Sequence, residues 1–149
     1  NKVSAAYGRR EPRDVVDLLT IHERILPLGA VIWASAGKAI GFTPEGIVNE
    51  IRRVARYTEA DFRRVASDPP VDPVVTMTRL RQALVEAETF IERMPTELAG
   101  LVFLDGAKVV QPDPAHLDRY QSHAGQRRGQ WPTSPDITEA MFERAAKAI

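Results

Sequence analysis

Residues 72–93, DPVVTMTRLRQALVEAETFIER, form the stretch that decides the fold class of this chain. The segment starts within the rigid proline-rich turn DPPVDP and continues without any further proline or glycine. Its apolar stripe recurs at the helical spacing of three and four residues and consists of Met77, Leu80, Leu84, Ala87 and Ile91. We therefore predict the longest helix of the chain over these residues.

Similar patterns predict helices on both sides of this segment. Thr43 followed by Pro44 is typical of an N-cap with proline in the first helical turn, and Thr58 with Asp61 resembles a capping box. The remaining predicted helices are a helix tail over residues 1–8 stopped by Gly8, a helix from about Glu11, a short buried helix in LGAVIWASAGK, one from Thr58 to about Ala66, and a final helix from about Asp136.

The segment GLVFLDGAKVVQP, residues 100–112, predicts strands instead of a helix. Two apolar stretches flank Asp105-Gly106, which is the strongest short signal for a β-hairpin. A lone hairpin is marginal in water, so it must dock on helices or extend a sheet. Residues 112–135 are predicted to be a loop or an extended arm. The fold class is mainly α, a helical bundle with one short β-hairpin (Leu101–Val110), and residues 1–149 form a single domain.

Composition excludes several function classes. Lys+Arg and Asp+Glu number 20 each, so no global field attracts nucleic acid or an anionic membrane. The chain has no cysteine, which excludes disulfides and thiolate zinc sites and fits a reducing compartment. No apolar run approaches the roughly 20 residues of a membrane span, and the first residues do not form a signal peptide. We expect a cytoplasmic protein with no membrane partner.

Most catalytic and metal-binding motifs are absent from the sequence. The histidines, His22, His116 and His123, lack metal-ligand spacing. Neither a dinucleotide fingerprint nor a P-loop nor a serine-hydrolase elbow occurs. Asp-x-Asp, the usual seat of a magnesium pair, is also missing. The sequence therefore predicts no metal site of its own.

Arginine is used far more often than lysine, with sixteen arginines against four lysines. The arginines gather in four local clusters, which are Arg9, Arg10 and Arg13; Arg52, Arg53 and Arg56; Arg63 and Arg64; and Arg127 and Arg128. Two interpretations stay open. The bias can reflect a GC-rich genome, or it can serve a phosphate-bearing partner, because guanidinium forks suit phosphate better than ammonium groups do.

A charged group near the start of the chain also has two interpretations. Asp14 and Asp17 are three residues apart in an apolar helical pattern and share a helix face. A turn at Gly8 can fold Lys2 back toward that face. The group is then either an ion-pair cluster that fastens two helices together or part of a functional site.

The segment KVSAAYGRREPRDVVDLL, residues 2–19, resembles the third and fourth motifs of the AbiEii-type nucleotidyltransferase toxins. In that family a helix bearing lysine runs to an arginine, and a short polar turn leads to Arg-Asp and a second Asp. The residues on these places are Lys2, Arg9, Arg13, Asp14 and Asp17. The resemblance covers about the first fifth of the chain.

The resemblance implies transfer of a nucleoside monophosphate from a nucleoside triphosphate, often to RNA, within a toxin–antitoxin pair. It implies that Lys2, Arg9 and Arg13 bind the nucleotide, with Lys2 neutralising the leaving pyrophosphate. It also implies that one of Asp14 and Asp17 is a catalytic base or organiser, while the other holds Arg13. Which acid has which role stays open.

The chain departs from this family in one respect. The family's Gly-Ser loop and Asp-x-Asp metal pair, which precede the lysine, are absent. We therefore expect the C-terminal helical part of a longer protein, inactive alone, with Mg²⁺ and the nucleoside triphosphate bound only together with the missing N-terminal domain. The alternative is a non-enzymatic helical interaction module that binds a partner through its hairpin and last helix.

Overall fold

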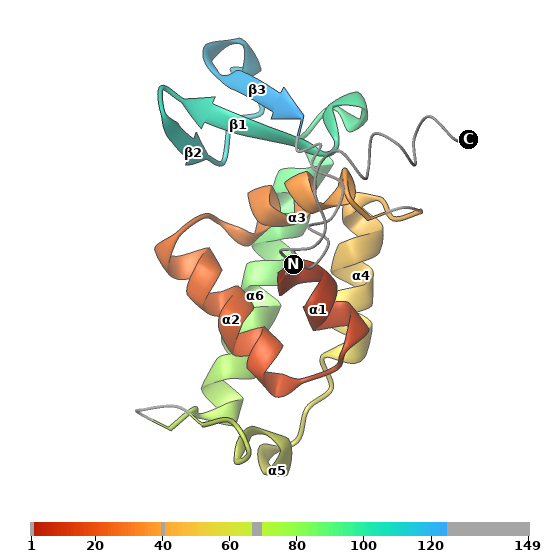
Figure 1. Ribbon diagram of the computed structural model, residues 1–149, viewed down its shortest axis with the longest axis vertical. Helices are drawn as coiled ribbons and strands as arrows, with labels where there is room; N and C mark the ends of the chain where they lie inside the picture. Colours follow the sequence, from red (N-terminus) through yellow and green to blue (C-terminus); the bar gives the residue numbers. More distant parts are fainter. Residues whose placement is uncertain (1, 40, 67–69, 125–149) are drawn as a thin grey trace, which may run out of the picture.

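The computed structural model describes residues 2–39, 41–66 and 70–124, and within them the protein is mainly helical (Figure 1). The helices are α1 (Lys2–Gly8), α2 (Pro12–Arg24), α3 (Leu28–Ala36), α4 (Pro44–Val54), α5 (Glu59–Phe62) and α6 (Pro73–Glu92). The strands are β1 (Leu101–Asp105), β2 (Lys108–Val110) and β3 (Gln121–Ala124). Short 3-10 turns occupy Thr96–Leu98 and Leu117–Arg119. The final predicted helix and the arm around Trp131 lie outside the described residues.

The helix starts follow the predicted capping chemistry. The Thr43 hydroxyl accepts a hydrogen bond of 3.1 Å from the Gly46 amide at the start of α4. Thr58 and Asp61 form the reciprocal capping box of α5. This helix ends at Phe62, earlier than the predicted Ala66, and Phe62 is its single buried residue. Without an apolar stripe to pack, further helical turns gain little stability.

The core lies where α3 and α6 pack against each other, with α1, α2 and α4 around them (Figure 1). Among the described residues, Trp33 is the largest fully buried side chain. Its indole nitrogen donates a hydrogen bond of 2.9 Å to the Leu98 carbonyl oxygen, and its ring meets Phe90 edge-on at 6.3 Å between centroids. The predicted apolar stripe of α6 faces this core, with Leu80, Leu84, Ala87 and Ile91 buried.

The predicted hairpin is confirmed, but it belongs to a three-stranded antiparallel sheet in the order β2-β1-β3. Asp105 pairs with Lys108, so the turn residues are Gly106 and Ala107, and Gly106 takes a φ of 60°. Glycine is the residue that accepts this conformation without strain. The sheet lies at one end of the helical bundle and α5 at the other (Figure 1).

The prediction of a loop or extended arm over residues 112–135 is wrong for Gln121–Ala124. These residues form β3 and pair with β1, with Leu101 opposite Ala124. All four are exposed, so the segment lacks the alternation that marks a half-buried strand. Its backbone hydrogen bonds to β1, and not its side chains, hold it in the sheet. Within the described residues no helix is long and apolar enough to cross a membrane.

Candidate functional site: an ion-pair cluster and an arginine pocket

Two ion pairs join the α1 end of the chain to α2. The Lys2 ammonium nitrogen lies 2.5 Å from Asp17 Oδ2, and an Arg9 guanidinium nitrogen lies 2.7 Å from Asp14 Oδ1. The turn after Gly8 does fold the lysine back toward the acid-bearing face of α2, as the sequence suggested. Four of the five residues on the family motif therefore form two cation–carboxylate pairs side by side on one pair of helices.

The two acids differ strongly in exposure. The side chain of Asp14 is 1% exposed, whereas that of Asp17 is 29% exposed and its lysine partner 50%. Asp14 Oδ2 is buried without a hydrogen-bond partner among the described residues. A buried carboxylate oxygen without a partner is costly. Asp17 is consequently the acid that a ligand can reach, and Asp14 is the acid sealed between the helices.

Arg13 does not pair with either acid, contrary to the implication that one of them holds it. Asp14 is paired with Arg9, and Asp17 is paired with Lys2. The Arg13 guanidinium has no hydrogen bond or ion pair within the described residues, and its side chain lines a pocket instead. The first turn of α2 directs Arg13 outward because the buried face of this helix is taken by Asp14 and Val15.

The pocket has a volume of about 740 Å³ and lies at the α5 end of the bundle. Residues from the first turn of α2, the C-terminal end of α4 and the turn after α5 line it. We name it the arginine pocket after its basic lining residues, which are Arg10, Arg13, Arg53, Arg56 and Arg64. Three of the four arginine clusters in the sequence thus converge on one space, and the fourth, Arg127 and Arg128, lies outside the described residues.

Few of these guanidinium groups are neutralised. Arg53 bonds to Glu50 on α4 at 2.7 Å. The other four basic lining residues have no hydrogen bond or ion pair through their side chains in the described part of the chain. Two acids, Glu11 and Asp61, also line the pocket. Hydrogen bonds from the Thr58 backbone and hydroxyl, together with the charge of Arg64, hold the pKa of Asp61 below its ordinary value, so Asp61 stays ionised as part of the cap.

Tyr57 forms part of the pocket wall and is close enough to the buried Asp14 to be affected by its charge. Its hydroxyl is buried without a hydrogen-bond partner among the described residues. Burial raises the pKa of Tyr57, and the negative charges of Asp14 and Glu11 raise it further, while Arg10 opposes them. The Tyr57 hydroxyl therefore stays protonated and uncharged beside these charged groups. Nothing in the sequence pattern marks Tyr57 for this position.

Arg10 occupies a strained backbone conformation at the edge of the pocket. Its φ is 55°, and among the described residues it is the single non-glycine residue with a positive φ. Gly8, which the sequence suggests as the helix stop, ends α1 without a positive φ. Left-handed conformations at non-glycine residues concentrate at functional sites, where the surrounding structure enforces them. The turn therefore holds an arginine where glycine is the least strained choice.

The described residues do not form a magnesium site. No group of three histidine, aspartate or glutamate side chains is close enough to hold a metal ion in the described ranges. Asp14 and Asp17 are each taken up by a basic group, which competes with a cation for the same oxygens. Two carboxylates engaged in this way do not fit Mg²⁺.

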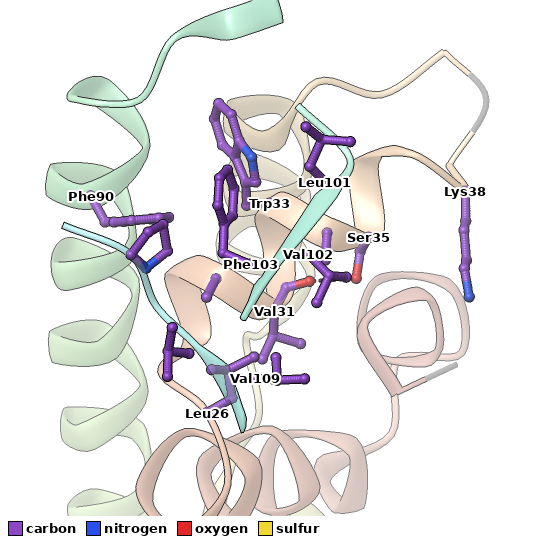
Figure 2. A pocket seen from close by; sticks show the side chains of 14 residues that line it. Leu26, Val31, Trp33, Ser35, Lys38, Phe90, Leu101, Val102, Phe103 and Val109 are labelled. Atoms are coloured by element: carbon purple, nitrogen blue, oxygen red, sulfur yellow. Dashed lines mark hydrogen bonds between the residues drawn. The ribbon is translucent and has the colours of Figure 1, made fainter. Parts of the chain in front are cut away.

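A second, apolar pocket of about 240 Å³ lies between α3 and the sheet. Figure 2 shows Trp33, Phe90 and Phe103 on one side of it and Ser35 and Lys38 on the other. Val109, which is 41% exposed, forms part of its rim. This pocket has few polar groups with which to orient a substrate, so it is a weaker candidate for chemistry than the arginine pocket.

Comparison of the chain with protein-family models, with curated proteins and with solved structures finds no match in any of the three. The resemblance to AbiEii-type nucleotidyltransferases therefore depends on the five motif residues alone.

Proposed function

We propose that this chain is the C-terminal helical part of a nucleotidyltransferase that transfers a nucleoside monophosphate from a nucleoside triphosphate, as the toxin of a toxin–antitoxin pair. The observation that supports it most is the Lys2–Asp17 pair, in which an amine and an acid meet at 2.5 Å while both stay accessible to solvent. In the proposal RNA is the acceptor, an antitoxin is the protein partner, and the chain alone is inactive.

The proposed reaction needs a base and a cation at one place. A hydroxyl oxygen of the acceptor attacks the α-phosphorus and forms a new P–O bond, while the bond from the α-phosphorus to the bridging oxygen breaks. The electron pair leaves with pyrophosphate, and the hydroxyl proton passes to a carboxylate. Lys2 stabilises the negative charge that accumulates on the pyrophosphate.

The difference in exposure suggests how the two acids divide their roles. Asp17 is 29% exposed and can reach the acceptor, so we assign the proton transfer to it. Asp14 is sealed by Arg9 and positions the start of α2, so it acts as a structural organiser. In this proposal Arg9 does not contact the nucleotide and influences the site only by holding Asp14 in place. Arg13 is free to bind phosphate directly.

An ion pair between helices is not evidence of catalysis in itself. Arg79 on α6 pairs with Glu23 on α2 in the same way, and Arg52 on α4 pairs with Glu88 on α6. Exposed pairs of this kind contribute about 0.2–1 kcal/mol to stability. The experiment therefore has to separate a loss of chemistry from the loss of an ordinary helix-to-helix contact.

The test uses the complete reading frame, expressed with Lys2→Ala, Asp17→Asn or the control Arg79→Ala. The measurement is transfer of the labelled α-phosphate of a nucleoside triphosphate to RNA, together with the thermal unfolding midpoint of each variant. We expect transfer to fall by about 100-fold or more in the first two variants and to stay near wild type in the control. Wild-type transfer by a folded Lys2→Ala protein would overturn the proposal, as would an upstream reading frame without Gly-Ser and Asp-x-Asp.

The apolar pocket favours a second candidate, a non-enzymatic interaction module. Its rim includes Val109 and Val102 from the sheet, which apolar side chains of a partner can cover (Figure 2). In this case Lys2→Ala leaves the biological activity unchanged, whereas Val109→Asp abolishes it. Measuring both variants in one activity assay on the complete gene distinguishes the two candidates.

A further inference from the structure

We infer that the arginine pocket binds a small anion that carries two or more linked phosphate groups, such as pyrophosphate or triphosphate. The inference does not depend on the proposed transferase function. It rests on the convergence of Arg10, Arg56 and Arg64 with two further arginines on one concave surface. These three residues lie outside the five positions of the family motif.

The first argument is the local excess of positive charge. The chain as a whole carries no net charge, with 20 basic and 20 acidic residues. Five arginines nevertheless line this pocket against two acids, Glu11 and Asp61, and Glu50 pairs with one of the arginines, Arg53. Guanidinium groups in excess of their counter-charges repel each other, so the arrangement costs stability unless an anion occupies the pocket.

The second argument is that the free donors come from three separate segments. Arg13 extends from the first turn of α2, Arg56 follows α4, and Arg64 follows α5. In the described part of the chain none of these three side chains makes a hydrogen bond or ion pair. Guanidinium forks bind phosphate oxygens in pairs, so donors on three sides suit several phosphate groups better than one. The N-terminal end of α2 adds its positive dipole on the same side.

The third argument is size. A volume of about 740 Å³ lies within the range of small-molecule pockets, about 300–1,000 Å³. Pro12, Val54 and Val65 add apolar surface beside the arginines. Proteins that follow a nucleic-acid backbone place basic residues along an extended groove, whereas here five arginines line a single pocket. This clustering favours a compact polyphosphate over an RNA strand.

The strained backbone of Arg10 is an independent observation at the same place. Its φ of 55° is one that glycine accepts with the least cost. The strain brings a charged side chain to the pocket edge, where its field acts on Tyr57 and on Glu50. A purely structural turn has no need for arginine at this position.

The test is titration calorimetry of the 149-residue chain with pyrophosphate and triphosphate, without added metal ions, at low and at physiological salt. The test variants are Arg56→Gln and Arg64→Gln. The matched controls are Arg63→Gln, next in the chain to Arg64 but paired with Glu59, and Arg52→Gln, paired with Glu88. We expect each test variant to lose affinity by about tenfold and each control to bind like wild type. Circular dichroism confirms that all four variants are folded.

Three results would overturn the inference. The first is absence of binding of both polyphosphates to the folded wild-type chain. The second is equal affinity for orthophosphate and triphosphate, which would indicate general charge attraction. The third is a single-stranded RNA oligonucleotide that binds and is not displaced by triphosphate, which would indicate a nucleic-acid surface. Lys2 and Asp17 lie outside the pocket, so failure here leaves the transfer assay on those residues untouched.

Discussion

Arg9 bonds at 2.7 Å to Asp14, the one buried acid among the described residues, and the Arg9 side chain is 57% exposed while that of Asp14 is 1% exposed. The hydrogen bond that Arg9 donates to Asp14, and then the negative charge of that carboxylate, raise the pKa of Arg9. The pair therefore favours the charged form of the arginine. It is the main compensation for a carboxylate that has left water.

Arg9→Met should consequently destabilise the protein more than Lys2→Met does. Both changes remove a cation from a pair between α1 and α2, but the first leaves a buried carboxylate uncompensated and the second leaves one that water can reach. The measurement is the urea midpoint of each variant at neutral pH. Equal midpoints would show that Asp14 gains access to water in solution.

Arg10→Gly should stabilise the fold and weaken anion binding at the same time. A non-glycine residue in the left-handed region costs about 1–2 kcal/mol, and the greater freedom of glycine in the unfolded chain offsets about 0.5–1 kcal/mol of this. The net expected gain in the free energy of unfolding is about 0.5–1 kcal/mol. Arg10→Ala is the control, because it removes the charge and keeps the strain. A gain in the alanine variant as well would mean that charge repulsion, not φ, is relieved.

Glu88→Gln should change the pH dependence of stability. A hydrogen bond from Arg52, and then its charge, lower the pKa of Glu88 below its ordinary value of 4.5. Because the folded pKa is the lower one, the pair stabilises the protein above about pH 4.5 and this contribution is lost as the pH falls through the folded value. We expect Glu88→Gln to cost about 0.2–1 kcal/mol at pH 7 and to cost nothing in strong acid.

Urea unfolding of wild type and variant at neutral and acidic pH measures this difference. Glu92→Gln is the control, because Glu92 also lies on α6 but has no ion pair in the described part of the chain. It should leave the free energy of unfolding unchanged at both pH values. A cost of Glu88→Gln that is the same at both pH values would contradict the assignment to the Arg52 pair.

Gly100→Ala should be strongly destabilising. Gly100 has a φ of 92°, and a Cβ at this position would lie 2.7 Å from the Gly37 Cα at the end of α3. Strain and overlap with backbone together predict a loss of roughly 2–4 kcal/mol. Gly8→Ala is the matched control, since nothing lies within 4 Å of its added Cβ. Thermal unfolding of both variants tests the prediction, and similar midpoints would show that α3 and the sheet approach each other less closely.

The positions of the helices could be predicted from the sequence because their signals are local. The Thr43 cap and the Thr58–Asp61 capping box operate over three residues, and the stripe on α6 repeats within one turn. The hairpin was predictable for the same reason. β3 was not, because Gln121–Ala124 carry no alternating pattern and are held by β1, about twenty positions earlier in the chain.

The sequence by itself determined a mainly helical chain with a hairpin and a charged segment that places Lys2 near two acids. Only the tertiary structure decided that Lys2 pairs with Asp17, that Arg9 pairs with Asp14, and that Arg13 pairs with neither acid. It also decided that arginines from three distant segments line one pocket. The physical reason is the separation along the chain over which each interaction acts, because helical periodicity and capping involve only residues a few positions apart. Which side chains meet across helices depends on how the whole core packs.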